Sequence, residues 1–113
     1  VRDRYQRDAV VNGLAQHGVE VRAVDREAAG RGRPVVMTMH RAKGLEFRKV
    51  LLFDVSKNAI PRPLRDQQYS DADRDDALLR ERSLLYVAAT RARDQLAISW
   101  SGEASPLITT LAP

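Results

Sequence analysis

The spacing of apolar residues along this 113-residue chain changes from helical to strand-like and back. Over residues 3–17 apolar side chains recur every three or four positions, and Gly18 follows directly, which predicts an amphipathic helix ending at this glycine. Closely spaced valines predict a short strand within residues 19–24. Residues 35–39 and 50–55 are apolar runs of the kind found in parallel strands that are covered on both faces.

The second half of the chain continues this alternation of helices and strands. Residues 75–93 place leucine, valine and alanine on one wide face, which predicts a helix. Residues 95–100 alternate apolar and polar side chains and predict the last strand. Ser105 followed by Pro106 is typical of a helix start, because serine caps free N–H groups and proline fits the first turn. Polar segments rich in glycine, proline or charge are predicted to be loops at residues 25–34 and 56–73.

The resulting order of helix, three strands, helix, strand and helix predicts a small α/β fold, and the length is that of a single domain over residues 1–113. The net charge of +4 is compatible with a polyanionic partner without requiring one. The chain has no cysteine, which excludes disulfides, thiolate metal sites and a cysteine nucleophile. No apolar run approaches the ~20 residues of a membrane span, and no signal peptide opens the chain. We therefore expect a soluble cytoplasmic protein and, because the chain begins at Val1 without methionine, a piece of a longer one.

The loop at residues 38–47 gathers groups suited to binding an anion. It follows a predicted strand, and in α/β proteins the ligand crevice lies at the carboxyl ends of the strands. Taken singly, each residue also has an ordinary structural interpretation. His40 and Lys43 could be surface side chains, Gly44 a turn residue with positive φ, and Glu46 an ion-pair partner of the basic residues that follow it.

A second group of polar residues lies near the end of the helix predicted at residues 75–93. Tyr86, Thr90 and Arg93 recur at helical spacing, and Arg91 lies beside that row. The planar guanidinium fork of arginine suits phosphate oxygens. The alternative is a solvated helix end, where a cation interacts favourably with the helix dipole.

Read together, the two groups resemble a known pair of motifs. The string T-x-H-x-x-K-G-L-E-F at residues 38–47, followed by L-Y-V-A-x-T-R-A-R at residues 85–93, resembles motifs V and VI of superfamily 1 DNA helicases of the UvrD/Rep/PcrA type. Val1 and Arg2, followed by an amphipathic helix, are similar to the end of motif IV. The resemblance implies the C-terminal RecA-like domain (2A) of such a helicase. This P-loop NTPase-type fold has a mostly parallel central sheet flanked by helices, and it closes over ATP held mainly by an N-terminal domain.

The same resemblance implies roles in nucleotide binding and hydrolysis for four residues. Arg91 matches the motif VI arginine finger, which stabilises charge in the transition state of phosphoryl transfer. Arg2 matches the motif IV arginine that does similar work. Glu46 matches the glutamate that accepts a hydrogen bond from the nucleotide ribose, and Gly44 allows close approach of the backbone to the nucleotide.

Three further residues are expected to contact nucleic acid. Thr38 and His40 match positions that meet single-stranded DNA, either alone or at a junction with duplex. Lys43 is assigned to the same surface, although it and Tyr86 could instead serve ATP or an interdomain contact. Thr90 is expected to support the arginine that follows it.

Two departures from the family pattern shape the functional prediction. The chain has no GxxxxGK[ST] loop, so ATP with Mg²⁺ is expected to be held by the N-terminal RecA-like domain of the same protein, and the isolated fragment to be inactive. Only about 35 residues separate Arg2 from Thr38, too few for the extra 2B domain of UvrD, Rep and PcrA, whether that domain is naturally absent or was deleted. We predict the C-terminal motor domain of an ATP-dependent helicase or translocase. The alternative is a non-catalytic module, derived from such a domain, that binds nucleic acid or protein; retention of Glu46 and Arg91 argues against it.

Overall fold

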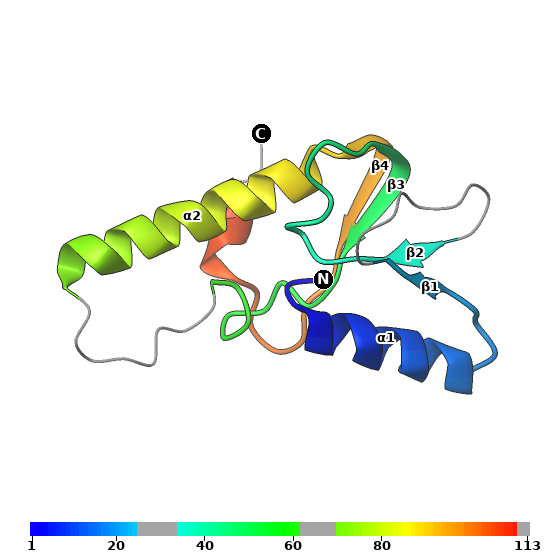
Figure 1. Ribbon diagram of the computed structural model, residues 1–113. Helices are drawn as coiled ribbons and strands as arrows, with labels where there is room; N and C mark the ends of the chain where they lie inside the picture. Colours follow the sequence, from blue (N-terminus) through cyan, green and yellow to red (C-terminus); the bar gives the residue numbers. More distant parts are fainter. Residues whose placement is uncertain (25–33, 62–69, 111–113) are drawn as a thin grey trace.

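A computed structural model describes residues 1–24, 34–61 and 70–110 of the chain (Figure 1). The predicted loops at residues 25–34 and 56–73 therefore lie partly outside the described residues. The described residues form two α-helices and two pairs of parallel strands, in agreement with the predicted α/β class. In chain order the elements are α1 (Arg4–Gln16), β1 (Arg22–Ala23), β2 (Val35–Val36), β3 (Phe47–Leu52), α2 (Asp71–Ala89), β4 (Ala92–Ile98) and a 3₁₀ helix (Pro106–Thr110).

Helix α1 begins one residue later and ends one residue earlier than the predicted range 3–17, and both ends are set by local chemistry. The Asp3 carboxylate accepts a hydrogen bond from the Gln6 N–H at 2.8 Å and caps the first turn. The helix stops before His17, and Gly18 takes the left-handed conformation with φ +78° that favours glycine. Neither α1 nor α2, the α-helices of the described residues, is long and apolar enough to cross a membrane.

Helix α2 begins four residues earlier than predicted, at Asp71, and ends earlier, at Ala89. The acidic run at its start, interpreted as loop, instead forms a capping box: the Asp73 N–H bonds the Ser70 hydroxyl at 3.1 Å, and the Ser70 N–H bonds the Asp73 carboxylate at 3.3 Å. Acidic side chains are also favourable at the positive end of the helix dipole. At the other end the chain passes directly into β4.

The strands pair in parallel, as predicted, but in two separate two-stranded sheets rather than one central sheet. In one sheet Arg22 faces Val35 and Ala23 faces Val36; in the other Phe47 faces Ala92 and the register runs on to Leu52 and Ile98. The prediction of a single central sheet is therefore wrong for the described residues. Just beyond β2, the edge formed by Met37 and Met39 is hydrogen-bonded to Val1.

Val1 forms two backbone hydrogen bonds to this edge. Its ammonium donates to the Met37 carbonyl at 2.9 Å, and its carbonyl accepts from the Met39 N–H at 2.8 Å. Burial lowers the pKa of the Val1 ammonium from 8.0 to about 6, partly offset by the nearby Asp3 carboxylate. An ammonium is thus withdrawn from water at the start of the chain.

This burial predicts a pH-dependent stability for the 113-residue chain with a free amino terminus. Because the folded-state pKa is about 6 and the ordinary value is 8.0, the unfolded chain binds more protons between these pH values. The free energy of unfolding should therefore rise as pH increases from 6 to 8, by at most about 3 kcal/mol. Denaturant titrations at both pH values measure this. An N-terminally acetylated chain should lose most of the increase, and the same increase in the acetylated chain would contradict the assignment.

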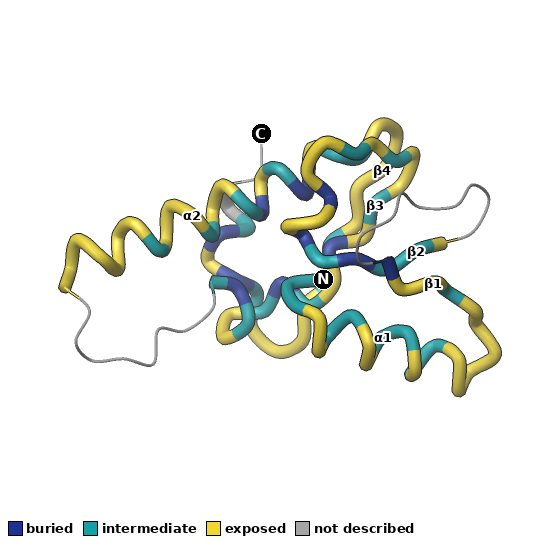
Figure 2. Tube along the Cα trace, viewed as in Figure 1, coloured by how far each residue is buried: buried dark blue, intermediate teal, exposed yellow. Residues whose placement is uncertain are grey.

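The core consists of two clusters that meet at the 38–47 loop. In the larger cluster, the C-terminal half of α2 packs on β3 and the 3₁₀ helix, whereas the N-terminal half of α2 extends from the body and is exposed (Figure 2). The smaller cluster joins Val24, Met37 and Ala42 beneath the loop. The buried residues of the larger cluster are Met39, Leu52, Val55, Ile60, Leu85, Ala88, Ala89 and Leu107.

Candidate functional site

The 38–47 loop is a series of tight turns anchored at two points. The Arg41 N–H bonds the Thr38 carbonyl at 3.0 Å, the Ala42 N–H bonds the Met39 carbonyl at 3.2 Å, and the Leu45 N–H bonds the Ala42 carbonyl at 3.0 Å. Met39 is buried in the larger core cluster and Ala42 in the smaller one. The loop is therefore held in one position by both clusters, with Thr38 half-buried at its start.

Gly44 adopts a backbone conformation that the loop requires. Its φ is +82°, which L-residues rarely adopt, and no heavy atom lies within 4 Å of the position that a Cβ would take. Any cost of adding a side chain here is therefore backbone strain rather than a clash. The open space also leaves the backbone at Gly44 approachable.

Substitution of Gly44 should separate this strain from ordinary side-chain effects. Gly44→Ala is expected to lower the free energy of unfolding by about 1–2 kcal/mol, because the left-handed conformation is unfavourable for alanine. Gly13→Ala is the matched control: it lies within α1, also has nothing within 4 Å of its Cβ position, and should raise stability by about 0.5–1 kcal/mol. Urea denaturation measures both, and shifts of the same sign would contradict the assignment.

The two motif regions are joined to each other directly. The Phe47 N–H donates to the Arg91 carbonyl at 2.9 Å, and Arg91 Nη1 donates to the Leu45 carbonyl at 3.4 Å. Beside this junction, Glu46 Oε1 lies 3.8 Å from Arg93 Nε in an exposed ion pair. The ordinary interpretation of Glu46 as a partner of the basic residues next to it in sequence is therefore wrong, since its partner comes from β4.

Arg91 is half-buried and makes three side-chain hydrogen bonds at the end of α2. Besides the Leu45 carbonyl, it donates from Nε to the Val87 carbonyl at 3.1 Å and from Nη2 to the Thr90 hydroxyl at 3.3 Å. The Thr90 hydroxyl in turn donates to Val87 at 3.0 Å, so Thr90 supports Arg91 as expected. Arg91 thus also stabilises the helix end, which was the structural alternative for this residue. Tyr86, one turn earlier, is exposed.

Arg2 is paired with a residue that the sequence did not single out. Its Nε donates to Glu81 Oε2 at 3.1 Å, and its Nη2 donates to Glu81 Oε1. The two side chains are only 14% and 12% exposed. Glu81 lies one helical turn before Leu85, which is completely buried. A carboxylate on the buried face of a helix needs a charged or hydrogen-bonding partner, so the spacing of Glu81 and Leu85 could have indicated one.

Arg2 and Arg91 are consequently held at different levels of α2. Arg2 bonds Glu81, whereas Arg91 bonds the Val87 carbonyl, six residues or about 9 Å further along the helix axis. Sequence comparison with the helicase motifs placed both arginines at one phosphate. The structure brings Arg91 to the Leu45–Phe47 junction and Arg2 to a groove beside α2.

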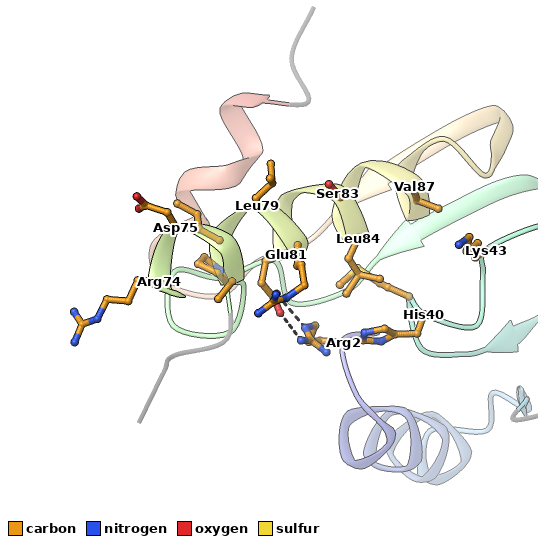
Figure 3. Close-up of a pocket in the computed structure, with 15 residues that line it drawn as sticks. Arg2, His40, Lys43, Arg74, Asp75, Leu79, Glu81, Ser83, Leu84 and Val87 are labelled. Carbon is orange, nitrogen blue, oxygen red and sulfur yellow. Dashed lines mark hydrogen bonds and ion pairs between the residues drawn. The ribbon is translucent and has the colours of Figure 1, made fainter. Parts of the chain in front are cut away.

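The groove has a volume of about 1020 Å³ and runs between α2 and the 38–47 loop (Figure 3). His40 and Lys43, both exposed, line it together with Arg2 and Glu81. Its apolar wall is formed by Met39, Pro61, Leu78, Leu84 and Val87. The predicted site residues therefore fall into two groups: Arg2, His40 and Lys43 in the groove, and Glu46 and Arg91 at the junction, with Gly44 between them in sequence. Within the described ranges, no cluster of three or more histidine or acidic side chains could hold a metal ion.

The fold is similar to that of one solved structure. The chain aligns with the C-terminal domain of a possible DNA helicase from Lactobacillus plantarum WCFS1 with a TM-score of 0.71 and 22% identity, over 98% of this chain and 59% of that one. Residues 32–103 match the UvrD-like helicase C-terminal domain. The chain belongs to this family.

Two relatives are similar in sequence over most of the chain. YjcD of Bacillus subtilis strain 168, a proposed ATP-dependent DNA helicase, is 36% identical over 83 residues, covering 74% of this chain and 11% of the relative. The ATP-dependent DNA helicase UvrD2 of Mycobacterium tuberculosis H37Rv is 36% identical over 86 residues, covering 72% of this chain and 12% of the relative. The match thus spans about a tenth of the length of these relatives.

Proposed function

We propose that this chain is the C-terminal motor domain of an ATP-dependent DNA helicase or translocase. In this proposal it contributes Arg91 as arginine finger and Glu46 as ribose acceptor to an ATP site shared with an N-terminal RecA-like domain of the same protein. The observation that carries the proposal is the junction between the two motifs, where Arg91 bonds Leu45 through its side chain and Phe47 through its carbonyl. Membership of the UvrD-like family and relatives named as ATP-dependent DNA helicases support it.

Arg91 is suited to this role because it can exchange a weak hydrogen bond to a carbonyl for a stronger one to phosphate. Its contact to the Leu45 carbonyl is long, at 3.4 Å, and a neutral carbonyl is a weaker acceptor than a phosphate oxygen. A γ-phosphate brought to the junction would therefore compete favourably for the guanidinium. The charge that develops on the transferring phosphoryl group is what an arginine finger stabilises.

The 38–47 loop would link nucleotide and nucleic acid. Its groove side carries His40 and Lys43, with Thr38 at its start, as contacts for single-stranded DNA or a junction with duplex. Its other end meets Arg91 at the Leu45 carbonyl. Movement of Arg91 toward phosphate would release the Leu45 carbonyl, and this change at one end of the loop would link the nucleotide to the DNA contacts at the other end.

ATP with its Mg²⁺ would be held mainly by the N-terminal domain, and hydrolysis would need both domains. The isolated chain is therefore expected to be inactive, and a cytoplasmic location remains a prediction. The competing function is a binding module without ATPase activity. It is favoured by one observation, namely that Arg91 also serves as a helix cap through Val87 and Thr90.

ATP hydrolysis by the full-length protein, measured with and without single-stranded DNA, tests the proposal. We expect the DNA to stimulate turnover and the 113-residue chain alone to hydrolyse no ATP. A full-length protein that binds single-stranded DNA but hydrolyses no ATP would contradict the motor assignment and favour the binding module.

A further inference from the structure

Glu81 holds Arg2 in a geometry that goes beyond a surface ion pair. Both oxygens of the carboxylate accept from the guanidinium, one from Nε and one from Nη2, so the two planar groups lock edge to edge. Surface pairs are flexible and contribute little, but here the side chains are 14% and 12% exposed. The orientation of Arg2 is therefore set by Glu81.

The locked orientation leaves donors for a ligand. A guanidinium has five N–H groups, and the pair with Glu81 uses one on Nε and one on Nη2. Arg2 lines the groove, with His40 beside it and Lys43 further along the same wall (Figure 3). A fixed arginine beside an imidazole, in a groove that a lysine also lines, is suited to a phosphate oxygen, because its donors need no reorganisation on binding.

We propose that Glu81 is the positioning residue of Arg2: it directs the remaining N–H groups of Arg2 toward a phosphate bound in the groove, without touching that phosphate itself. The inference rests on the proposed function, in which two phosphate sources exist, the γ-phosphate of ATP and the backbone of single-stranded DNA. Because Arg2 lies beside His40 and apart from Arg91, its N–H groups could bind a phosphate oxygen from either source.

The test is a double-mutant cycle in the full-length protein, with Glu81→Gln, Arg2→Ala and the combination. Turnover of ATP without DNA and the affinity for single-stranded DNA are measured for each, together with the thermal midpoint. Glu81→Gln should lower one of the two phosphate-dependent quantities by about 10- to 100-fold, because misdirecting one group by about 1 Å has effects of this size. When Arg2→Ala is already present, Glu81→Gln should lower the same quantity by less than about a further twofold, because the residue that Glu81 positions has been removed.

Two further carboxylate variants control for folding. Glu81→Asp keeps the charge but withdraws the carboxylate by one methylene, so it should keep the thermal midpoint near wild type and still show the loss. Glu103→Gln removes a carboxylate from an exposed ion pair with Lys57 and should change neither quantity. If Glu81 only stabilised the fold, its variants would lower the thermal midpoint, and their effects on turnover and DNA affinity would not depend on Arg2.

Which of the two quantities falls identifies the source of the phosphate. Reduced turnover with unchanged DNA affinity indicates the nucleotide, and reduced DNA affinity with unchanged basal turnover indicates the DNA backbone. Glu81 variants that leave both within about twofold, or whose effects multiply with those of Arg2→Ala, would overturn the proposal. Arg91→Ala, measured in parallel, tests the proposed arginine finger separately, because Arg91 bonds Val87, Leu45 and Thr90 rather than Glu81. Near-normal turnover of that variant would refute the arginine finger and not the Arg2–Glu81 coupling, whereas a wild-type protein that hydrolyses no ATP would refute the motor.

Discussion

Arg91→Ala in the full-length protein is expected to lower kcat for ATP hydrolysis by about 10³-fold or more while leaving ATP binding largely intact. The reason is that an arginine finger interacts most strongly with charge that develops in the transition state, so its loss affects turnover more than binding. Steady-state hydrolysis and binding of a fluorescent ATP analogue measure the two quantities. Turnover close to wild type would refute the arginine-finger assignment.

Two controls separate this catalytic loss from a structural one. Arg91 also bonds the Val87 and Leu45 carbonyls, so its removal alone could loosen the end of α2. Arg91→Lys keeps the charge but not the planar fork, and it should remain strongly impaired while unfolding near the wild-type temperature. Arg48→Ala removes an exposed arginine that pairs with Asp94 at 3.4 Å, and it should change turnover by less than about twofold.

His40→Ala is expected to reduce DNA-stimulated turnover by about tenfold, with less than a twofold change in basal turnover. His40 is exposed in the groove next to Arg2, where its ring can meet a base or phosphate of single-stranded DNA. Its loss would weaken the strand contact and leave the junction at Arg91 intact. The measurement is hydrolysis as a function of single-stranded DNA concentration.

The chain provides a matched control for this substitution. His17, the other of the two histidines, is exposed at the end of α1, away from the 38–47 loop in sequence. His17→Ala should therefore leave both basal and stimulated turnover unchanged. If His40→Ala reduced basal and stimulated turnover by the same factor, the strand-facing assignment of His40 would be wrong.

Local signals in the sequence predicted the order and type of the elements well. Asp3 and Gly18 set the ends of α1, and Ser105 caps the last helical turn through the Leu107 N–H, each through contacts within a few residues. The start of α2 was missed because Asp71 and Asp73 are polar residues typical of a loop, whereas here they lie in the first turn after the N-cap Ser70, and Asp73 completes the capping box. Whether acidic residues lie in a loop or in the first turn of a helix depends on the neighbouring cap residue, and the spacing of apolar residues does not show it.

Long-range contacts were the part that the sequence did not predict. Val1 bonds the Met37 carbonyl across 36 positions, and the strands form two separate sheets. The motif strings singled out residues 38–47 and 85–93, which contact each other through Leu45, Phe47 and Arg91, but they did not predict that Arg2 would be locked by Glu81 across 79 positions. Helix and strand propensities and the spacing of apolar residues carry no information on which distant charge completes an ion pair, so this pair could not be predicted from the sequence.

In the proposed function, Arg91 leaves the 38–47 loop to stabilise phosphoryl transfer at a site shared between two domains. A structure of the full-length protein with single-stranded DNA and ADP–aluminium fluoride, a mimic of the transition state, tests it most directly. We expect an Arg91 guanidinium nitrogen about 3 Å from the fluoride that stands for the γ-phosphate oxygens, with the bond to the Leu45 carbonyl broken. An Arg91 side chain that still bonds Leu45 and Val87, with another residue at the fluoride, would contradict it.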